Sequence, residues 1–223
     1  RPGGRVPHGD RRARAPGRRM AQGADVAAQI EQAEVYKRDG NALFKEGNYK
    51  RALGNYHKVF CYVNGLQVPG EKAEGYEGML VEQAGGSKVP ADKVEAVKRL
   101  KQSTHLNMAA CYLRINEHKK CVDACTKALG AAEPTSKAFF RRGQARLELR
   151  HLDEAKEDFE EARRLEPGDA AIEKELRRLK QAFAQHSQQE KKAFSRMFAK
   201  KDAAAADGPP AAADAPGDAA QDA

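Results

Sequence analysis

A spacing of small and aromatic residues recurs three times along the chain and constrains its fold more than any other feature. In its clearest copy, residues 136–167 carry two amphipathic helical patterns separated by a break near Arg150 and His151. The spaced positions of this copy are Gly143, Ala155, Phe159, Ala162 and Pro167. The matching positions 34 residues earlier are Ala109, Cys121, Cys125 and Ala128, and an earlier copy has Gly40, Ala52, Tyr56 and Val59. Small residues in one register predict that the two helices of each pair approach closely. A generic amphipathic hairpin would show the apolar stripe without this register of small residues.

One such helix pair leaves an apolar face uncovered, so the copies are expected to stack on one another. The pattern and the period resemble those of tetratricopeptide repeats. The sequence therefore predicts an all-α fold, in which three helix hairpins form a right-handed solenoid closed by a long C-terminal capping helix. The first and second copies lie 69 residues apart, about one period more than direct stacking needs, and residues 65–91 supply the excess.

These patterns divide the chain into three parts. Residues 1–23 are rich in Arg, Pro and Gly and residues 202–223 in Ala, Asp and Pro, so both are expected to be disordered. Residues 24–201 form the repeat domain, with repeat one at 33–64, an inserted loop at 65–91, repeats two and three at 102–167, and the capping helix at 169–200.

Within this domain, hydrophobic periodicity and helix-breaking residues predict the individual helices. We expect helices at 24–47, 49–63, 92–115 and 117–129, with Asp92 as an N-cap, Gly130 as a stop and Pro134 opening the third repeat. The insertion is rich in Gly and Pro and has no period, so it is predicted to be a loop. A flexible surface insertion is preferred to one whose apolar residues Tyr76, Met79, Leu80 and Val81 dock on the solenoid.

Composition narrows the class of protein. The chain has 223 residues, of which 40% are hydrophobic, enough for one continuous core. The four cysteines lack disulfide-like or CxxC spacing, and no apolar run is long enough for a membrane span or a secretory signal, so a cytoplasmic protein is expected. Because the chain begins with Arg, either the sequence is truncated upstream or Met20 is the true start. The Arg-rich leader resembles a transit peptide in composition but lacks an amphipathic face.

The first helices of stacked hairpins line a concave groove, so their polar residues decide what binds there. Lys37 and Asn41 are four residues apart and share a face of the first helix, and Lys137 and Arg141 repeat this spacing in the third repeat. Asn107 lies on the inner face of the second repeat. Three cations and two carboxamides in one groove favour an acidic peptide, since Arg and Lys bind carboxylates and Asn can donate to them.

The segments KRDGN, HLNMAACYL and KAFFRRGQA resemble the carboxylate-clamp repeats of co-chaperones. The resemblance covers residues 33–200 and is closest to the repeat domain of large FK-type immunophilins, as FFRRGQA, the stretched first connection and QEKKAFSRMF indicate. In that family, residues at the places of Lys37, Asn41, Asn107, Lys137 and Arg141 grip the C-terminal Glu-Glu-Val-Asp of cytosolic heat-shock chaperones. Apolar residues at the places of Phe44 and Ala110 hold its valine. The resemblance therefore implies a co-chaperone or adaptor with these seven peptide-binding residues.

Immunophilins pair such repeats with a prolyl isomerase domain, which is absent from these 223 residues, so no isomerase activity is carried over. The rival hypothesis is that this chain is the repeat half of an isomerase. Without a nucleophile–base motif or a phosphate-binding loop, the chain as given is predicted not to be an enzyme.

Three weaker signals remain. The final helix is basic and amphipathic, and related immunophilins bind calmodulin in this region, although a solvated face on a capping helix is preferred. His118, Cys121 and Cys125 share a helical face, but buried cysteines are preferred to a zinc site, and no metal or cofactor is expected. Nucleic-acid binding by residues 1–19 would be nonspecific, and it ranks below both interpretations of the final helix, as a calmodulin target or as a solvated face.

Overall fold

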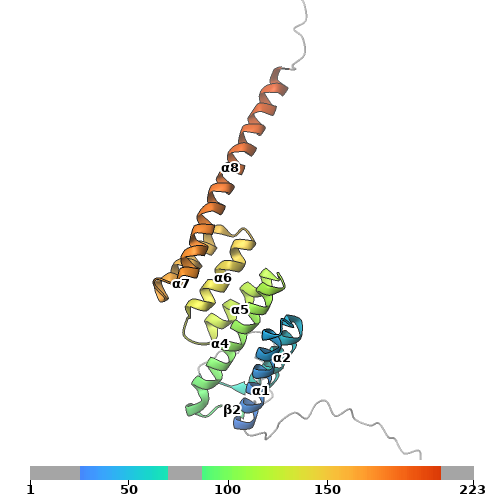
Figure 1. The fold of residues 1–223 in the computed structure, drawn as a ribbon, viewed down its shortest axis with the longest axis vertical. Coiled ribbons are helices and arrows are strands. Elements are labelled where there is room, and N and C mark those ends of the chain that lie inside the picture. Colours follow the sequence, from blue (N-terminus) through green and yellow to red (C-terminus); the bar gives the residue numbers. More distant parts are fainter. Residues whose placement is uncertain (1–25, 70–86, 207–223) are drawn as a thin grey trace, which may run out of the picture.

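The computed structural model describes residues 26–69 and 87–206, with side chains described as far as Met197. These ranges contain seven helices and one pair of two-residue strands (Figure 1). None of these helices is both long and apolar enough to cross a membrane. The N-terminal segment, the four apolar residues of the insertion (Tyr76, Met79, Leu80 and Val81) and the tail from residue 207 lie outside the described ranges.

Six of the helices form three antiparallel hairpins that stack in chain order. The hairpins are α1 (Val26–Lys45) with α2 (Tyr49–Val63), α4 (Ala91–Arg114) with α5 (His118–Ala131), and α6 (Ser136–Glu148) with α7 (Leu152–Leu165). They follow one another along the ribbon, from blue through green to yellow and orange (Figure 1). The predicted all-α fold of three hairpins is therefore confirmed.

The small residues of the repeat lie where paired helices come closest. A Cβ atom added at Gly40 would lie 2.6 Å from the ring of Tyr56, and one at Gly143 would lie 2.9 Å from the ring of Phe159. In the second hairpin, Ala109 and Cys125 occupy the same places and are fully buried. Each hairpin thus packs one small residue of its first helix against a larger residue of its second.

Replacing Gly40 with alanine should lower the free energy of unfolding by about 1–3 kcal/mol, because the added methyl overlaps the buried Tyr56 ring. Gly54 is the matched control: it lies within α2 with no atom within 4 Å of an added Cβ, so alanine there should stabilise by about 0.5–1 kcal/mol. Urea unfolding followed by circular dichroism measures both changes. Equal effects of the two substitutions would contradict the close approach of α1 and α2.

The turn inside each hairpin is built in the same way. Gly47, Asn116 and Arg150 all have positive φ, at 80°, 59° and 65°. The amide of the next residue donates to a carbonyl in the last turn of the preceding helix, each time at 2.9 Å: Asn48 to Leu43, Glu117 to Tyr112, and His151 to Arg146. These are left-handed helix ends that satisfy terminal carbonyls. All three turns lie at or next to breaks predicted from the sequence, although Asn116 and Arg150 carry a weaker turn signal than Gly47.

The two ends of the insertion form a pair of short strands, whereas the sequence predicted a loop there. The prediction was wrong for these residues. Strand β1 (Leu66–Gln67) pairs in parallel with β2 (Ser87–Lys88). Leu66, Val68 and Val89 are buried in a cluster with residues of α2 and of the N-terminal part of α4. Through this cluster, both ends of the insertion pack against the first repeat. The sequence does not predict this strand pair, because strands of two residues are too short to show a periodic pattern.

Three residues that were predicted to start or stop a helix do not do so. Helix α4 begins at Ala91 with Pro90 at the N-cap position, so Asp92 lies in the first turn and does not cap the helix. Helix α5 continues through Gly130 to Ala131. Helix α6 begins after Thr135 at its N-cap, so Pro134 lies before the helix. In each case the helix boundary differs from the predicted residue by one or two positions, because neighbouring residues can also start or continue a helix.

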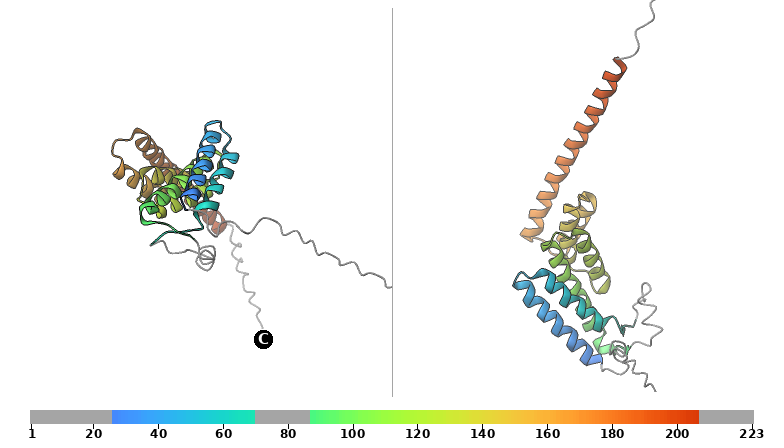
Figure 2. Two further views of the ribbon diagram at one scale, coloured as in Figure 1. Left: turned by 90° about the horizontal axis from the view of Figure 1, so that it is seen from below. Right: turned by 90° about the vertical axis from the view of Figure 1, so that its right-hand side faces the viewer.

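Helix α8 (Ala170–Ala206) covers the third hairpin with its N-terminal half and then extends away from the repeats (Figure 2). Leu179 and Ala182 are buried in a cluster with Leu147 of α6 and with Leu152 and Phe159 of α7. Further along, Phe194 is 61% exposed and Met197 is 64% exposed. The cap is therefore the first half of this helix, which runs beyond residue 200, where the sequence pattern ended.

Candidate peptide-binding groove

A hollow of about 300 Å³ lies between the first helices of the three hairpins. Its lining residues are Asn41, Phe44, Lys45, Tyr56, Asn107, Ala110 and Arg141. Five of the seven residues predicted to bind a peptide thus surround one hollow. The other two, Lys37 and Lys137, do not line it. Each precedes a lining residue, Asn41 or Arg141, by about one helical turn on the same helix.

Asn41 is held by two hydrogen bonds in the wall of this hollow. Its Oδ1 accepts the Tyr56 hydroxyl at 2.8 Å and the Asn107 Nδ2 at 2.8 Å. Burial, with a smaller contribution from Cys111, raises the pKa of Tyr56 to about 12 against the opposing effect of Asn107. The phenol therefore stays protonated and remains a donor. Because Asn41 Oδ1 is occupied, its Nδ2 is the group left to donate to a ligand.

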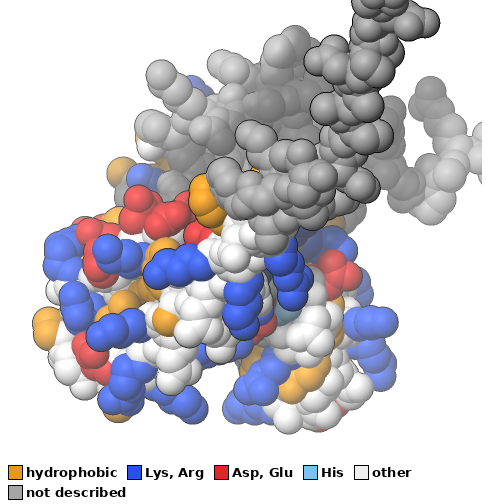
Figure 3. Space-filling model, turned by 90° about the horizontal axis from the view of Figure 1, so that it is seen from above, with side chains coloured by type: hydrophobic (Ala, Val, Ile, Leu, Met, Phe, Trp, Pro, Cys, Tyr) orange, Lys and Arg blue, Asp and Glu red, His pale blue; other side chains and the backbone are white. Residues whose placement is uncertain are grey.

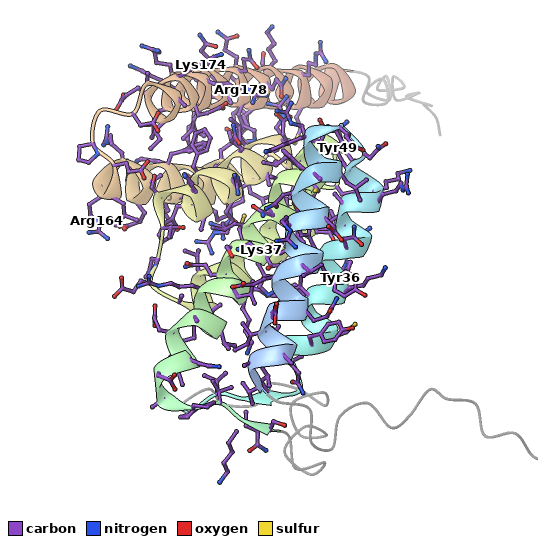
Figure 4. The ribbon with its side chains drawn as sticks, turned by 60° about the horizontal axis from the view of Figure 1, so that its bottom comes forward. Tyr36, Lys37, Tyr49, Arg164, Lys174 and Arg178 are labelled. Carbon is purple, nitrogen blue, oxygen red and sulfur yellow. The ribbon has the colours of Figure 1, made fainter. Side chains whose placement is uncertain are left out.

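Lys37 is positioned by α4, the neighbouring first helix. Its Nζ donates to Ser103 Oγ at 2.6 Å, and Ser103 Oγ in turn donates to the Leu100 carbonyl at 3.1 Å. Lys37 lies on the side of α1 that faces α4, whereas Tyr36 lies toward α2 (Figure 4). Burial lowers the pKa of Lys37, and Glu34 partly opposes this shift. A partly desolvated ammonium is stabilised by a carboxylate counter-ion, so Lys37 suits an acidic ligand.

The two cations of the third hairpin that were predicted to bind a peptide, Lys137 and Arg141, differ in their contacts. Arg141 donates through Nη1 to the Leu106 carbonyl at 2.7 Å and so ties α6 to α4. Lys137 is exposed and forms no hydrogen bond or ion pair with any residue in the described ranges. A guanidinium has five N–H donors, so Arg141 can keep this bond and still bind a carboxylate.

Three residues of the site were not predicted as binding residues. Lys45 adds a cation to the lining, and its place four residues after Asn41 continues the spacing of Lys37 and Asn41. Tyr56 was interpreted only as a packing residue, and Ser103 acts through a contact between repeats that no local pattern reveals. Lys and Arg side chains are also spread over much of the face seen in Figure 3. Basic charge on this face attracts acidic ligands over longer distances.

Cys121 and Cys125 are fully buried and serve as small core residues. The pKa of the Cys125 thiol is raised by its contact with Cys121 and by burial, so the thiol stays protonated. Within residues 26–69 and 87–197, no group of three His, Cys, Asp or Glu side chains is arranged to hold a metal ion.

Known proteins share both the sequence pattern and the fold. A family model for the tetratricopeptide repeat matches residues 136–169. The chain is 31% identical over 180 residues to peptidyl-prolyl cis-trans isomerase FKBP42 of Arabidopsis thaliana, covering 79% of the chain and 44% of the relative. It is 30% identical over 172 residues to peptidyl-prolyl cis-trans isomerase FKBP4 of Mus musculus, covering 77% of the chain and 33% of the relative.

Among solved structures, the first TPR of Spaghetti (RPAP3) bound to HSP90 peptide SRMEEVD matches with a TM-score of 0.51 at 26% identity. The match covers 70% of this chain and 98% of that one. The chain therefore carries a tetratricopeptide repeat domain. Its solved structural neighbours are repeat domains that mediate protein interactions and are not catalytic. This domain is homologous to the repeat region of the FK-type immunophilins. The chain spans less than half of the length of these relatives and does not cover their isomerase domain.

Proposed function

We propose that this protein is a co-chaperone or adaptor whose groove binds the C-terminal Glu-Glu-Val-Asp of cytosolic heat-shock chaperones. The observation that carries the proposal is the arrangement of Asn41, Asn107 and Arg141 around one hollow, with the Asn41 amide fixed by Tyr56 and Asn107. A solved relative of the same fold is bound to an HSP90 peptide that ends in these four residues, which supports the choice of ligand. The role would place the protein in the cytoplasm with its partners.

Each predicted residue has a distinct role in this proposal. Asn41 and Asn107 donate amide N–H groups to the carboxylates of the terminal Asp, with Lys37 as their counter-ion. Lys137 and Arg141 bind the carboxylates closer to the N-terminus of the peptide, where a bidentate Arg contact adds geometric selectivity. The apolar surfaces of Phe44 and Ala110 receive the valine side chain.

The affinity should be moderate. A single exposed ion pair contributes about 0.2–1 kcal/mol. Several pairs that converge on one short peptide, together with a buried valine, can reach about −8 kcal/mol, which corresponds to a micromolar Kd. Since most of these contacts are electrostatic and partly exposed, added salt should weaken them.

A fluorescence-anisotropy titration with a labelled peptide ending in Glu-Glu-Val-Asp tests the proposal. We expect saturable binding with a Kd on the order of micromolar that weakens several-fold between about 0.05 and 0.5 M salt. A peptide of the same composition in scrambled order is the control for net charge. Equal binding of both peptides would contradict the proposed site.

The two alternative functions, isomerase activity and calmodulin binding, lack comparable support. The isomerase activity belongs to a domain of the relatives that this chain does not cover. The comparisons likewise do not support calmodulin as a partner of α8. The adaptor role is therefore the function that the geometry supports best.

A further inference from the structure

A second hollow, of about 380 Å³, lies between α2, α4 and α5. Its lining residues are His57, Phe60, Asn64, His105, Met108, Tyr112, Lys120, Asp123, Ala124 and Lys127. Helix α4 contributes Asn107 and Ala110 to the first hollow but His105, Met108 and Tyr112 to this one. With 3.6 residues per turn, these two sets point to opposite sides of α4. The second hollow, here called the outer groove, is therefore separate from the peptide groove and can be occupied at the same time.

The floor of the outer groove is apolar and aromatic. The rings of Phe60 and His105 stack with their centroids 4.3 Å apart, and Met108 and Ala124 are buried beside them. Burial is the largest cause that lowers the pKa of His105 to about 4, and electrostatic effects of Lys127, Lys101 and His57 act in the same direction. The imidazole is thus neutral at physiological pH and presents an aromatic surface, on which an apolar side chain can pack.

The rim of the outer groove carries charges at fixed spacing along α5. Lys120 and Lys127 are two turns apart, which separates their Cα atoms by about 10 Å. Asp123 lies between them and would repel a carboxylate at the centre. Lys120 pairs at 3.3 Å with Glu117, whereas Lys127 forms no ion pair with any residue in the described part of the chain. The pair of Lys120 is exposed and weak, so Lys120 can exchange Glu117 for a ligand carboxylate. The groove therefore favours negative charge at both ends and an apolar group in the middle.

We infer that the outer groove binds an acidic peptide segment in which two carboxylates flank an aromatic or aliphatic anchor. In an extended peptide, a separation of about 10 Å corresponds to about three residues. A nucleotide fits less well, because its adjacent phosphates need donors that converge. The lining residues of α4 lie inside the helix, where backbone N–H groups are already bonded, and the two lysines are too far apart to converge. This inference does not depend on the function proposed for the peptide groove.

The test is a titration of the 15N-labelled full chain with a peptide that cannot use a terminal carboxylate, acetyl-Gly-Asp-Phe-Leu-Asp-Gly-amide. Saturable shifts of the amide signals of Phe60, Met108 and Lys127 are expected, with none at Asn41 or Ala110. Probes with Phe and Leu changed to Ala, or with both Asp changed to Asn, should lose most of the binding. These probes leave the protein unchanged, so the test does not depend on a variant that folds.

The matched variants are Lys127→Glu and Lys119→Glu, which make the same charge change on α5, although only Lys127 lines the outer groove. Lys127→Glu should weaken binding by at least about tenfold, and Lys119→Glu by less than about twofold. Equal effects of the two variants would overturn the inference, as would shifts confined to Asn41 and Ala110. ADP is the competing probe: a response of Phe60 and Lys127 to ADP but not to the peptide would also overturn it.

Discussion

Replacing Asp158 with alanine is expected to lower the free energy of unfolding by about 3–5 kcal/mol. Asp158 lies on α7, is 2% exposed, and accepts hydrogen bonds from two arginines of α6. Arg142 Nη2 lies 2.7 Å from its Oδ1, and Arg146 Nη1 lies 2.7 Å from its Oδ2. Removing the carboxylate leaves two largely buried guanidinium groups without their counter-ion. This is more costly than the loss of a surface ion pair.

Glu157 is the matched control, since it is the neighbouring acidic residue on α7 and is exposed. Glu157→Ala removes the same charge and should change stability by no more than about 0.5 kcal/mol. Urea unfolding measures both variants, and hydrogen exchange should locate the loss of protection of Asp158→Ala in α6 and α7. Similar midpoints for the two variants would show that the Arg142–Asp158–Arg146 cluster does not stabilise the third hairpin.

Replacing Lys137 or Arg141 with alanine is expected to weaken binding of the Glu-Glu-Val-Asp peptide by about ten- to a hundredfold, which abolishes it at micromolar concentrations. The two variants should differ in stability. Lys137 is exposed and has no described partner, so Lys137→Ala should leave the free energy of unfolding within about 0.5 kcal/mol of the original. Arg141 also bonds the Leu106 carbonyl, so Arg141→Ala should cost about 1.5–3 kcal/mol.

Lys137→Ala is therefore the cleaner test of binding. Lys156→Ala is its control, because Lys156 is an exposed lysine on α7, the second helix of the same hairpin. Anisotropy titrations of the three variants give the change in Kd, and circular dichroism confirms that each is folded. If Lys137→Ala and Lys156→Ala have the same Kd, Lys137 is not part of the binding site.

The repeat register made most of the fold predictable. Helix α2 begins and ends at the predicted residues, Tyr49 and Val63, because its apolar period and the preceding Gly47 are both local signals. The same register places Asn107 and Arg141 at equivalent positions, two residues before Ala109 and Gly143, so that both face the same side of the stacked hairpins. Asn41 lies three residues beyond the equivalent position of the first repeat, which is about one helical turn along the same face. Three residues that are far apart in the sequence could thus be predicted to converge.

Features that depend on a partner distant in the sequence were not predictable. The contact of Lys37 with Ser103, the pairing of β1 with β2, and the burial of Asp158 between two arginines all arise only when helices or strands from different segments meet. Asp158 in particular looks like an ordinary solvated residue on a highly charged helix. Its environment is set by Arg142 and Arg146 across the hairpin, which no period or composition reveals.

The central claim is that the groove recognises a C-terminal carboxylate through Asn41, Asn107 and Lys37. The most direct measurement compares two peptides that end in Glu-Glu-Val-Asp and differ only in a free carboxylate or a carboxamide at the terminus. Loss of this charge should weaken binding by at least about tenfold, because the amide donors and the ammonium lose their acceptor. Equal Kd values for the two peptides would contradict the account.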